Sequence, residues 1–155
     1  EALPIRQWSQ ADARFRGIEA EITTHLIGDA RGRLDLRAFG DRVRGELDGG
    51  ESLPRVAPGR FGLDLRWTAD AWRASLGATR VMAQDDVAPG ETRTPGYTFV
   101  DAHFAYHWDT SKLGWEVFAD GTNLTDQVGR VHTSFLKDKV VLPGRGVAAG
   151  VRVFF

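Results

Sequence analysis

The sequence contains no cysteine and no long apolar run, and these two absences exclude several classes of protein. Without cysteine there can be no disulfide framework, no thiolate metal site and no cysteine nucleophile. No stretch approaches the roughly 20 consecutive apolar residues that a membrane-spanning helix needs. The formal net charge of −1 gives no basis for nucleic acid as a partner.

Motifs of the common catalytic and nucleotide-binding sites are also absent. The sequence has no nucleophile elbow, no P-loop and no dinucleotide fingerprint. Its many carboxylates are spread along the chain, and no pair is predicted to share a dry pocket. We therefore predict that the protein is not an enzyme and carries no cofactor.

Apolar and polar residues instead alternate almost from end to end. A period of two residues predicts β-strands with one apolar and one polar face. The sequence therefore predicts an all-β fold of about seven strands. We place them at about 14–28, 33–44, 60–67, 72–82, 97–108, from 113 onward, and 146–155, with bulges near 121–129.

The predicted connections alternate between short and long. Residues 29–32, 68–71 and 109–112 are turn-like, whereas 45–59, 83–96 and 124–145 are long and rich in Gly, Pro and Asp. Antiparallel barrels of the bacterial outer membrane have short periplasmic turns and long extracellular loops. A soluble sandwich gives no reason for this asymmetry, so we favour a transmembrane β-barrel.

Tryptophan placement favours the same interpretation. Trp67 and Trp72 flank one short turn, and Trp108 and Trp115 flank another. All four lie on the apolar side of their strands, where amphipathic rings would form an aromatic girdle at the periplasmic membrane interface. The alternative is that these rings pack at hairpin ends without any membrane.

The polar side of the strands is unusually charged. In a barrel it would line the lumen, and in a soluble sandwich it would meet water; periodicity alone does not separate the two. The residues predicted to face the lumen are Glu19, Glu21, Arg37, Arg66, Arg73, Asp101 and His103.

Five short elements, in this order along the chain, resemble TonB-dependent outer-membrane receptors. They are R-G-I-E at 16–19, L-P…P…R at 53–60, T-P-G-Y-T-F-V-D at 94–101, N-L-T-D at 123–126, and P-G-R at 143–145 followed by alternation to a terminal Phe. Each element alone is weak, but the ordered set spans nearly the whole chain.

The resemblance implies a barrel of about 22 strands with a plugged lumen. Residues 1–155 would then be the C-terminal portion, with the plug absent from the sequence. The chain has no initiator methionine and an odd predicted strand count, and both are expected of a fragment. The family also implies location in the bacterial outer membrane, contact with its lipid, and coupling to the TonB complex through the plug.

The end of the chain resembles the signal that the barrel assembly machinery reads. Val151, Val153 and Phe155 follow one another at every second position. An exposed β-edge of this kind suits recognition by strand addition. The alternative is an ordinary edge strand that ends in Phe.

One segment bears on the substrate. The stretch R-V-H-T-S-F-L-K-D at 130–138 resembles zinc-uptake receptors of the family. His132 and Asp138 would offer imidazole and carboxylate ligands, which suit zinc. Asp85 and Asp86 would attract cations to a neighbouring loop, or would simply be solvated. Siderophore iron, haem and cobalamin stay open as alternative substrates.

The sequence therefore predicts part of an outer-membrane active transporter for a scarce metal or metal chelate, powered by TonB. Two alternatives come from other classes. A passive outer-membrane channel would need no plug, and a soluble β-sandwich binding module would need no lipid-facing belt.

Overall fold

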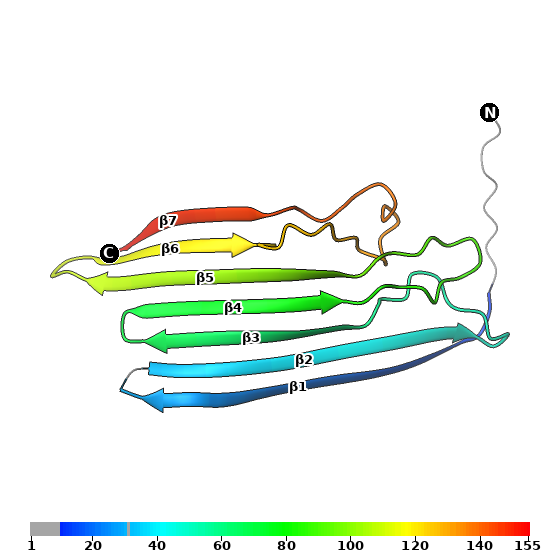
Figure 1. Ribbon diagram of the computed structural model, residues 1–155, viewed down its shortest axis with the longest axis horizontal. Helices are drawn as coiled ribbons and strands as arrows, with labels where there is room; N and C mark the ends of the chain where they lie inside the picture. Colours follow the sequence, from blue (N-terminus) through cyan, green and yellow to red (C-terminus); the bar gives the residue numbers. More distant parts are fainter. Residues whose placement is uncertain (1–9, 31) are drawn as a thin grey trace.

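Seven strands, each paired with the next, form one antiparallel sheet in the computed structural model, which describes residues 10–30 and 32–155 (Figure 1). All seven predicted strands are confirmed. They are β1 (Ala13–Asp29), β2 (Gly32–Leu47), β3 (Arg60–Ala69), β4 (Trp72–Val81), β5 (Tyr97–Asp109), β6 (Gly114–Thr122) and β7 (Gly146–Phe154).

The register carries the sequence alternation across the whole sheet. Paired residues of neighbouring strands point to the same face. One row runs from Asp35 through Arg66, Ser75 and His103 to Asp120, and the adjacent row consists of apolar residues. The sheet therefore has one face rich in charge and one rich in aliphatic and aromatic side chains, called here the polar face and the apolar face.

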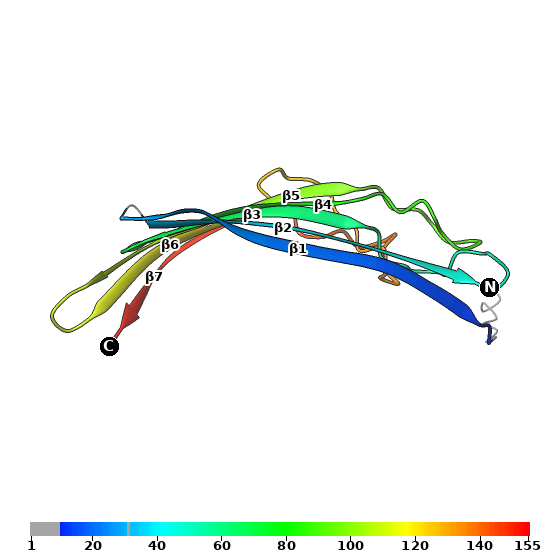
Figure 2. The same cartoon turned by 90° about the horizontal axis from the view of Figure 1, so that it is seen from below.

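Nothing in the described part of the chain covers the apolar face. On it, Ile18 is 73%, Leu63 53% and Val151 59% exposed. The sheet is a single curved layer (Figure 2). A sandwich would bury such faces between two sheets, whereas the wall of a membrane barrel presents its apolar face to lipid.

The two ends of the sheet differ as the connection lengths predict. Short turns lie at one end, and the long connections 48–59, 82–96 and 123–145 gather at the other (Figure 1). We call these the short-turn end and the long-loop end. Among the described residues, no helix has the length and apolar character to cross a membrane.

One irregularity interrupts the strand pairing. The register shifts between His25 and Ile27 in β1, which places a bulge at Leu26 near the short-turn end. The bulges predicted at 121–129 are wrong, because β6 ends at Thr122 and the chain then leaves the sheet. Asn123 has a positive φ of 46°, and this left-handed residue turns the chain out of the strand.

Candidate functional site

Charged side chains on the polar face pair across neighbouring strands. Arg37 lies between two carboxylates, with its guanidinium nitrogens 2.7 Å from Glu21 Oε2 and 2.8 Å from Asp64 Oδ2. His103 Nδ1 lies 2.6 Å from Asp120 Oδ1. Charge-assisted contacts of this kind tie the strands together sideways and satisfy much of the charge of the polar face within the sheet itself.

The residues predicted to face a lumen all lie on the polar face. The register brings together Glu19, Glu21, Arg37, Arg66, Arg73, Asp101 and His103. That this face borders a barrel lumen stays a prediction.

Glu116 is a polar-face residue that sequence reasoning does not single out. It is buried and lies between two arginines, accepting a hydrogen bond of 2.9 Å from Arg73 and another from Arg152. The triad joins β4, β6 and β7 near the short-turn end. Alternation places Glu116 on the polar face, but its two partners depend on strand pairing, which periodicity does not supply.

The last long connection folds back over the polar face. Tyr97 and Phe99 lie on that face at the long-loop end, and Gly129 packs against both rings. A Cβ at Gly129 would come within 2.9 Å of Phe99 and 3.1 Å of Tyr97. Glycine therefore permits the close approach that lets this connection cover part of the polar face.

A set of hydrogen bonds closes the base of the same connection. The Asn123 side-chain amide donates to the carbonyls of Gln127 and Pro143, and its oxygen accepts from the Gln127 N–H. Asp126 accepts from the Arg145 backbone N–H at 3.0 Å and faces its guanidinium. The N-L-T-D and P-G-R elements are thus two halves of one structural latch, called here the base latch.

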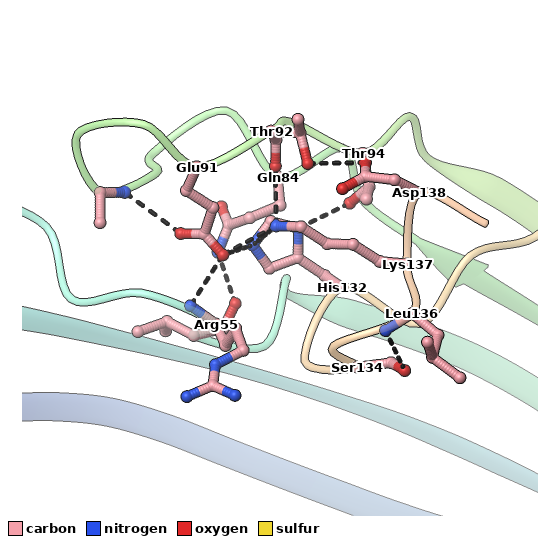
Figure 3. A network of polar contacts seen from close by, with 12 residues as sticks. Arg55, Gln84, Glu91, Thr92, Thr94, His132, Ser134, Leu136, Lys137 and Asp138 are labelled. Atoms are coloured by element: carbon pink, nitrogen blue, oxygen red, sulfur yellow. Dashed lines mark hydrogen bonds and ion pairs between the residues drawn. The ribbon is translucent and has the colours of Figure 1, made fainter. Parts of the chain in front are cut away.

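The long connections also share a buried cluster of polar side chains, called here the loop cluster. It consists of Glu91, His132 and Lys137 (Figure 3). Glu91 Oε1 is 2.7 Å from Lys137 Nζ and 3.2 Å from His132 Nε2. The same oxygen accepts the Arg55 backbone N–H at 2.9 Å. One carboxylate therefore holds all three long connections together.

The other members of the cluster have their own second partners. His132, which is 2% exposed, places Nδ1 2.9 Å from Thr94 Oγ1. Lys137 Nζ donates to the Thr92 carbonyl at 2.8 Å. Both imidazole nitrogens are thereby engaged, and the ammonium has two oxygen acceptors, so the buried charges are paired and hydrogen-bonded as burial requires.

The cluster shifts the titration of its members. Desolvation acts to raise the pKa of Glu91, but hydrogen bonds from Lys137 and from the Ala88 and Arg55 N–H groups outweigh it and lower that pKa. Burial, followed by the positive charge of Lys137, lowers the pKa of His132 against the opposing effect of Glu91. The cluster is therefore arranged for an ionised carboxylate and a neutral imidazole.

The residues predicted to bind metal lie in two of the long connections and differ in their surroundings. His132 lies in the loop cluster, whereas the exposed Asp138 accepts a hydrogen bond of 2.7 Å from Thr92. Asp85 and Asp86 are exposed in the neighbouring connection. Within the part of the chain that the structure describes, no three histidine or acidic side chains converge closely enough to hold a metal ion.

Sequence reasoning does not predict Glu91 and Lys137 as partners of His132. The signal for Lys137 is its place in the 130–138 stretch, five residues after His132. Glu91 comes from a different connection, and nothing in the sequence pairs it with either residue.

The four tryptophans predicted as a girdle lie on the apolar face at the short-turn end. Trp108 and Trp115 stack with ring centroids 6.2 Å apart, and Trp72 meets Tyr106 at 4.2 Å. At the end of the chain, Val151 and Val153 lie on this face of β7, and Phe155 follows the strand fully exposed. Their roles at a membrane interface and in assembly stay predictions.

Comparison with known proteins identifies the class to which this sheet belongs. The model of the family described as TonB dependent receptor-like, beta-barrel, matches residues 3–124, and the chain belongs to this family. The predicted resemblance to TonB-dependent receptors is confirmed, and the seven strands are a segment of its barrel fold.

A solved structure shows the same fold. The copper transporter OprC superposes with a TM-score of 0.74 and 21% sequence identity, over 93% of this chain and 24% of that chain. The present chain thus spans about a quarter of the length of that transporter. The closer likeness to zinc-uptake receptors is not tested by these comparisons and stays a prediction.

Proposed function

We propose that this chain supplies wall and extracellular loops to an outer-membrane active transporter that takes up a scarce metal or metal chelate, powered by TonB. The observation that carries the proposal is the family match over most of the chain. The uncovered apolar face supports the lipid-facing placement, and the charged polar face supports a hydrated lumen.

The long loops support a role in substrate capture. They are held in one arrangement by the loop cluster, and they expose Phe135, Leu136 and Asp85. A preformed loop surface binds a ligand at lower entropic cost than a mobile one. In this proposal the substrate meets the exposed loop residues first.

Direct metal binding by His132 and Asp138 is the finer part of the proposal. Because both nitrogens of His132 are engaged, a metal would have to replace Thr94 or Glu91 as its partner. Zinc titration of the purified receptor and of His132→Gln and Asp138→Asn variants tests this. Equal zinc affinity in all three proteins would exclude His132 and Asp138 as zinc ligands. Asp85 and Asp86 would then be tested in the same way.

Uptake measurements test the function itself. Cells with and without the gene would be supplied with labelled zinc, copper, ferric siderophore, haem or cobalamin; copper is included because the structurally similar OprC is a copper transporter. We expect uptake of one substrate to fall on deletion of either the receptor gene or TonB. Uptake that persists without TonB or a membrane potential would instead indicate a passive channel.

A further inference from the structure

Four exposed arginines gather on the apolar face where β1 and β2 reach the long-loop end. The register places Arg16 directly opposite Arg44, and Arg42 opposite Ile18, with Arg14 one step further out. All four share the face that carries the aliphatic belt. Charge on a lipid-facing surface is costly within the hydrocarbon and costs little at its edge.

These arginines have almost no counter-charge of their own. Arg14, Arg16, Arg42 and Arg44 make no ion pair or side-chain hydrogen bond among the residues that the structure describes. Glu46, opposite Arg14, and Asp86, which lines a hollow with Arg42 and Arg44, are the acidic residues beside them, while Asp12 and Asp48 lie just beyond the strand ends. Like charges directly opposite one another destabilise a strand pair unless an anion lies between them.

A boundary between uncharged and charged positions of the apolar face recurs on two other strands. On each of the three strands, four successive positions of this face carry no charge, and the next carries an arginine. That arginine is eight residues from the first uncharged position. The three pairs are Leu34 and Arg42 on β2, Trp72 and Arg80 on β4, and Val153 on β7 with Arg145 just before it, where Arg145 also pairs with Asp126 of the base latch.

This spacing matches the thickness of a membrane. Eight residues extend about 26 Å along a strand at 3.3 Å per residue. For a strand tilted by about 40° that is roughly 20 Å of height, close to the 25 Å apolar band of outer-membrane barrels.

The boundary also runs obliquely across the sheet, as it does in a tilted barrel. Arg80 shares a row with Gly40, so Arg42 lies two residues further toward the long-loop end. At the short-turn end, the β5–β6 pair Asp109–Gly114 lies three positions beyond the row of Trp72 and Tyr106. From β1 toward β7, the end of the strands at the short turns therefore shifts in the same direction as the arginines at the long-loop end. A flat membrane plane crosses tilted strands along such a diagonal.

We propose that the outward-facing arginines bind phosphate groups on the headgroups of outer-leaflet lipid, and that Arg16, Arg42 and Arg44 form the main site. The planar guanidinium matches phosphate oxygens in a bidentate geometry. Basic clusters at the edge of an apolar belt attract anionic headgroups. The site rests on the outer-membrane placement of the barrel and does not depend on the transported substrate.

A hollow beside the arginines favours a headgroup over a bare phosphate ion. It lies where β2 meets two of the long connections and contains groups of both signs. The polar side chains that line it are Arg42, Arg44, Glu46, Ser52, Gln84 and Asp86. Such a lining suits a phosphorylated sugar headgroup, whose hydroxyls can donate to the carboxylates.

The test uses the full-length receptor in detergent micelles, mixed with lipid A that carries two phosphates or with the same lipid after dephosphorylation. Native mass spectrometry counts the bound lipid. We expect the receptor to retain the phosphorylated form and the Arg42→Gln/Arg44→Gln variant to retain about tenfold less. The control variant Arg60→Gln/Arg66→Gln removes the same charge from the polar face and should bind like the wild type.

Three results would overturn the proposal. These are equal retention of the two lipids by the wild type, equal loss in both variants, and full displacement of lipid by millimolar inorganic phosphate. If the glutamine variant does not fold, Arg42→Lys/Arg44→Lys keeps the charge and should show intermediate retention. Because lipid retention is measured without transport, a failed uptake experiment leaves this result intact, and the reverse also holds.

Discussion

The apolar face at the short-turn end of the sheet is built from aromatic rings, whereas the connections at the long-loop end are held together by charges and hydrogen bonds. At the first, Trp72 contacts Tyr106 and Trp108 stacks on Trp115, each pair on neighbouring strands. At the second, Glu91 pairs with Lys137, 46 residues further along the chain. One end is therefore organised by strand pairing itself, and the other by contacts between connections.

The two sets of contacts should respond differently to single substitutions. Stacked rings at an interface contribute individually modest amounts, so loss of one leaves the others in place. The loop contacts form one network, in which a lost group leaves a buried partner unsatisfied. We therefore expect single substitutions to have large effects in the loop network at the long-loop end and small effects among the aromatic rings at the short-turn end.

The base latch should show the largest effect. Asn123→Ala removes several hydrogen bonds from a residue that is 2% exposed and has positive φ, so we expect a local loss of about 3 kcal/mol in the stability of connection 123–145. Hydrogen exchange of the full receptor measures it. Asn123→Gly is the matched control, because glycine keeps the backbone conformation while losing the amide. Wild-type protection in Asn123→Ala would show that the latch contributes little.

The loop cluster comes next. Glu91→Gln leaves the buried Lys137 without its counter-charge, and we expect the three connections to loosen by about 2 kcal/mol. The double variant Glu91→Gln/Lys137→Met should recover part of the loss, because neither charge then remains buried. Protease sensitivity of the loops in the wild type, Glu91→Gln, Lys137→Met and the double variant completes the cycle. Strictly additive effects would mean that the two residues are not coupled.

Acid should weaken the same cluster in two stages. The lowered pKa of His132 means that the folded loops bind fewer protons than the open ones, so stability falls as pH drops below about 6.5. The lowered pKa of Glu91 has the same sign and acts at lower pH, below its ordinary value of 4.5. Loop proteolysis between pH 8 and 4 would follow this, and His132→Gln should flatten the upper stage. A pH-independent cleavage rate in the wild type would contradict it.

The same comparison explains what the sequence could and could not predict. Strands, face assignment and the position of the four tryptophans follow from alternation, which is a local property of the chain. The loop cluster depends on which connection meets which, and alternation carries no information about that. Glu91 is accordingly one loop carboxylate among several in the sequence, although in the structure it joins all three connections.

The family motifs could be predicted from the sequence only in part. N-L-T-D and P-G-R are recognisable in the sequence as separate elements, but only the fold shows Asp126 bound to Arg145 and Asn123 bound to Pro143. The predicted bulges at 121–129 fail for the same reason. Period-2 reasoning continues a strand past Thr122, where the left-handed Asn123 ends it.

The smallest expected effect lies at the short-turn end. Trp115→Leu removes one ring of the Trp108–Trp115 stack and should lower barrel stability by about 1 kcal/mol, whereas Trp115→Phe, which keeps a ring, should cost less. Urea unfolding of the receptor in lipid bilayers measures both. Quenching of tryptophan fluorescence by lipids brominated at different depths then separates two explanations. Quenching strongest near the headgroups would place these rings at the interface, and quenching strongest at the bilayer centre would contradict the girdle. A loss of several kcal/mol in barrel stability on removal of this one ring would contradict the expected difference between the two ends. The rings of the short-turn end would then be as cooperative as the loops.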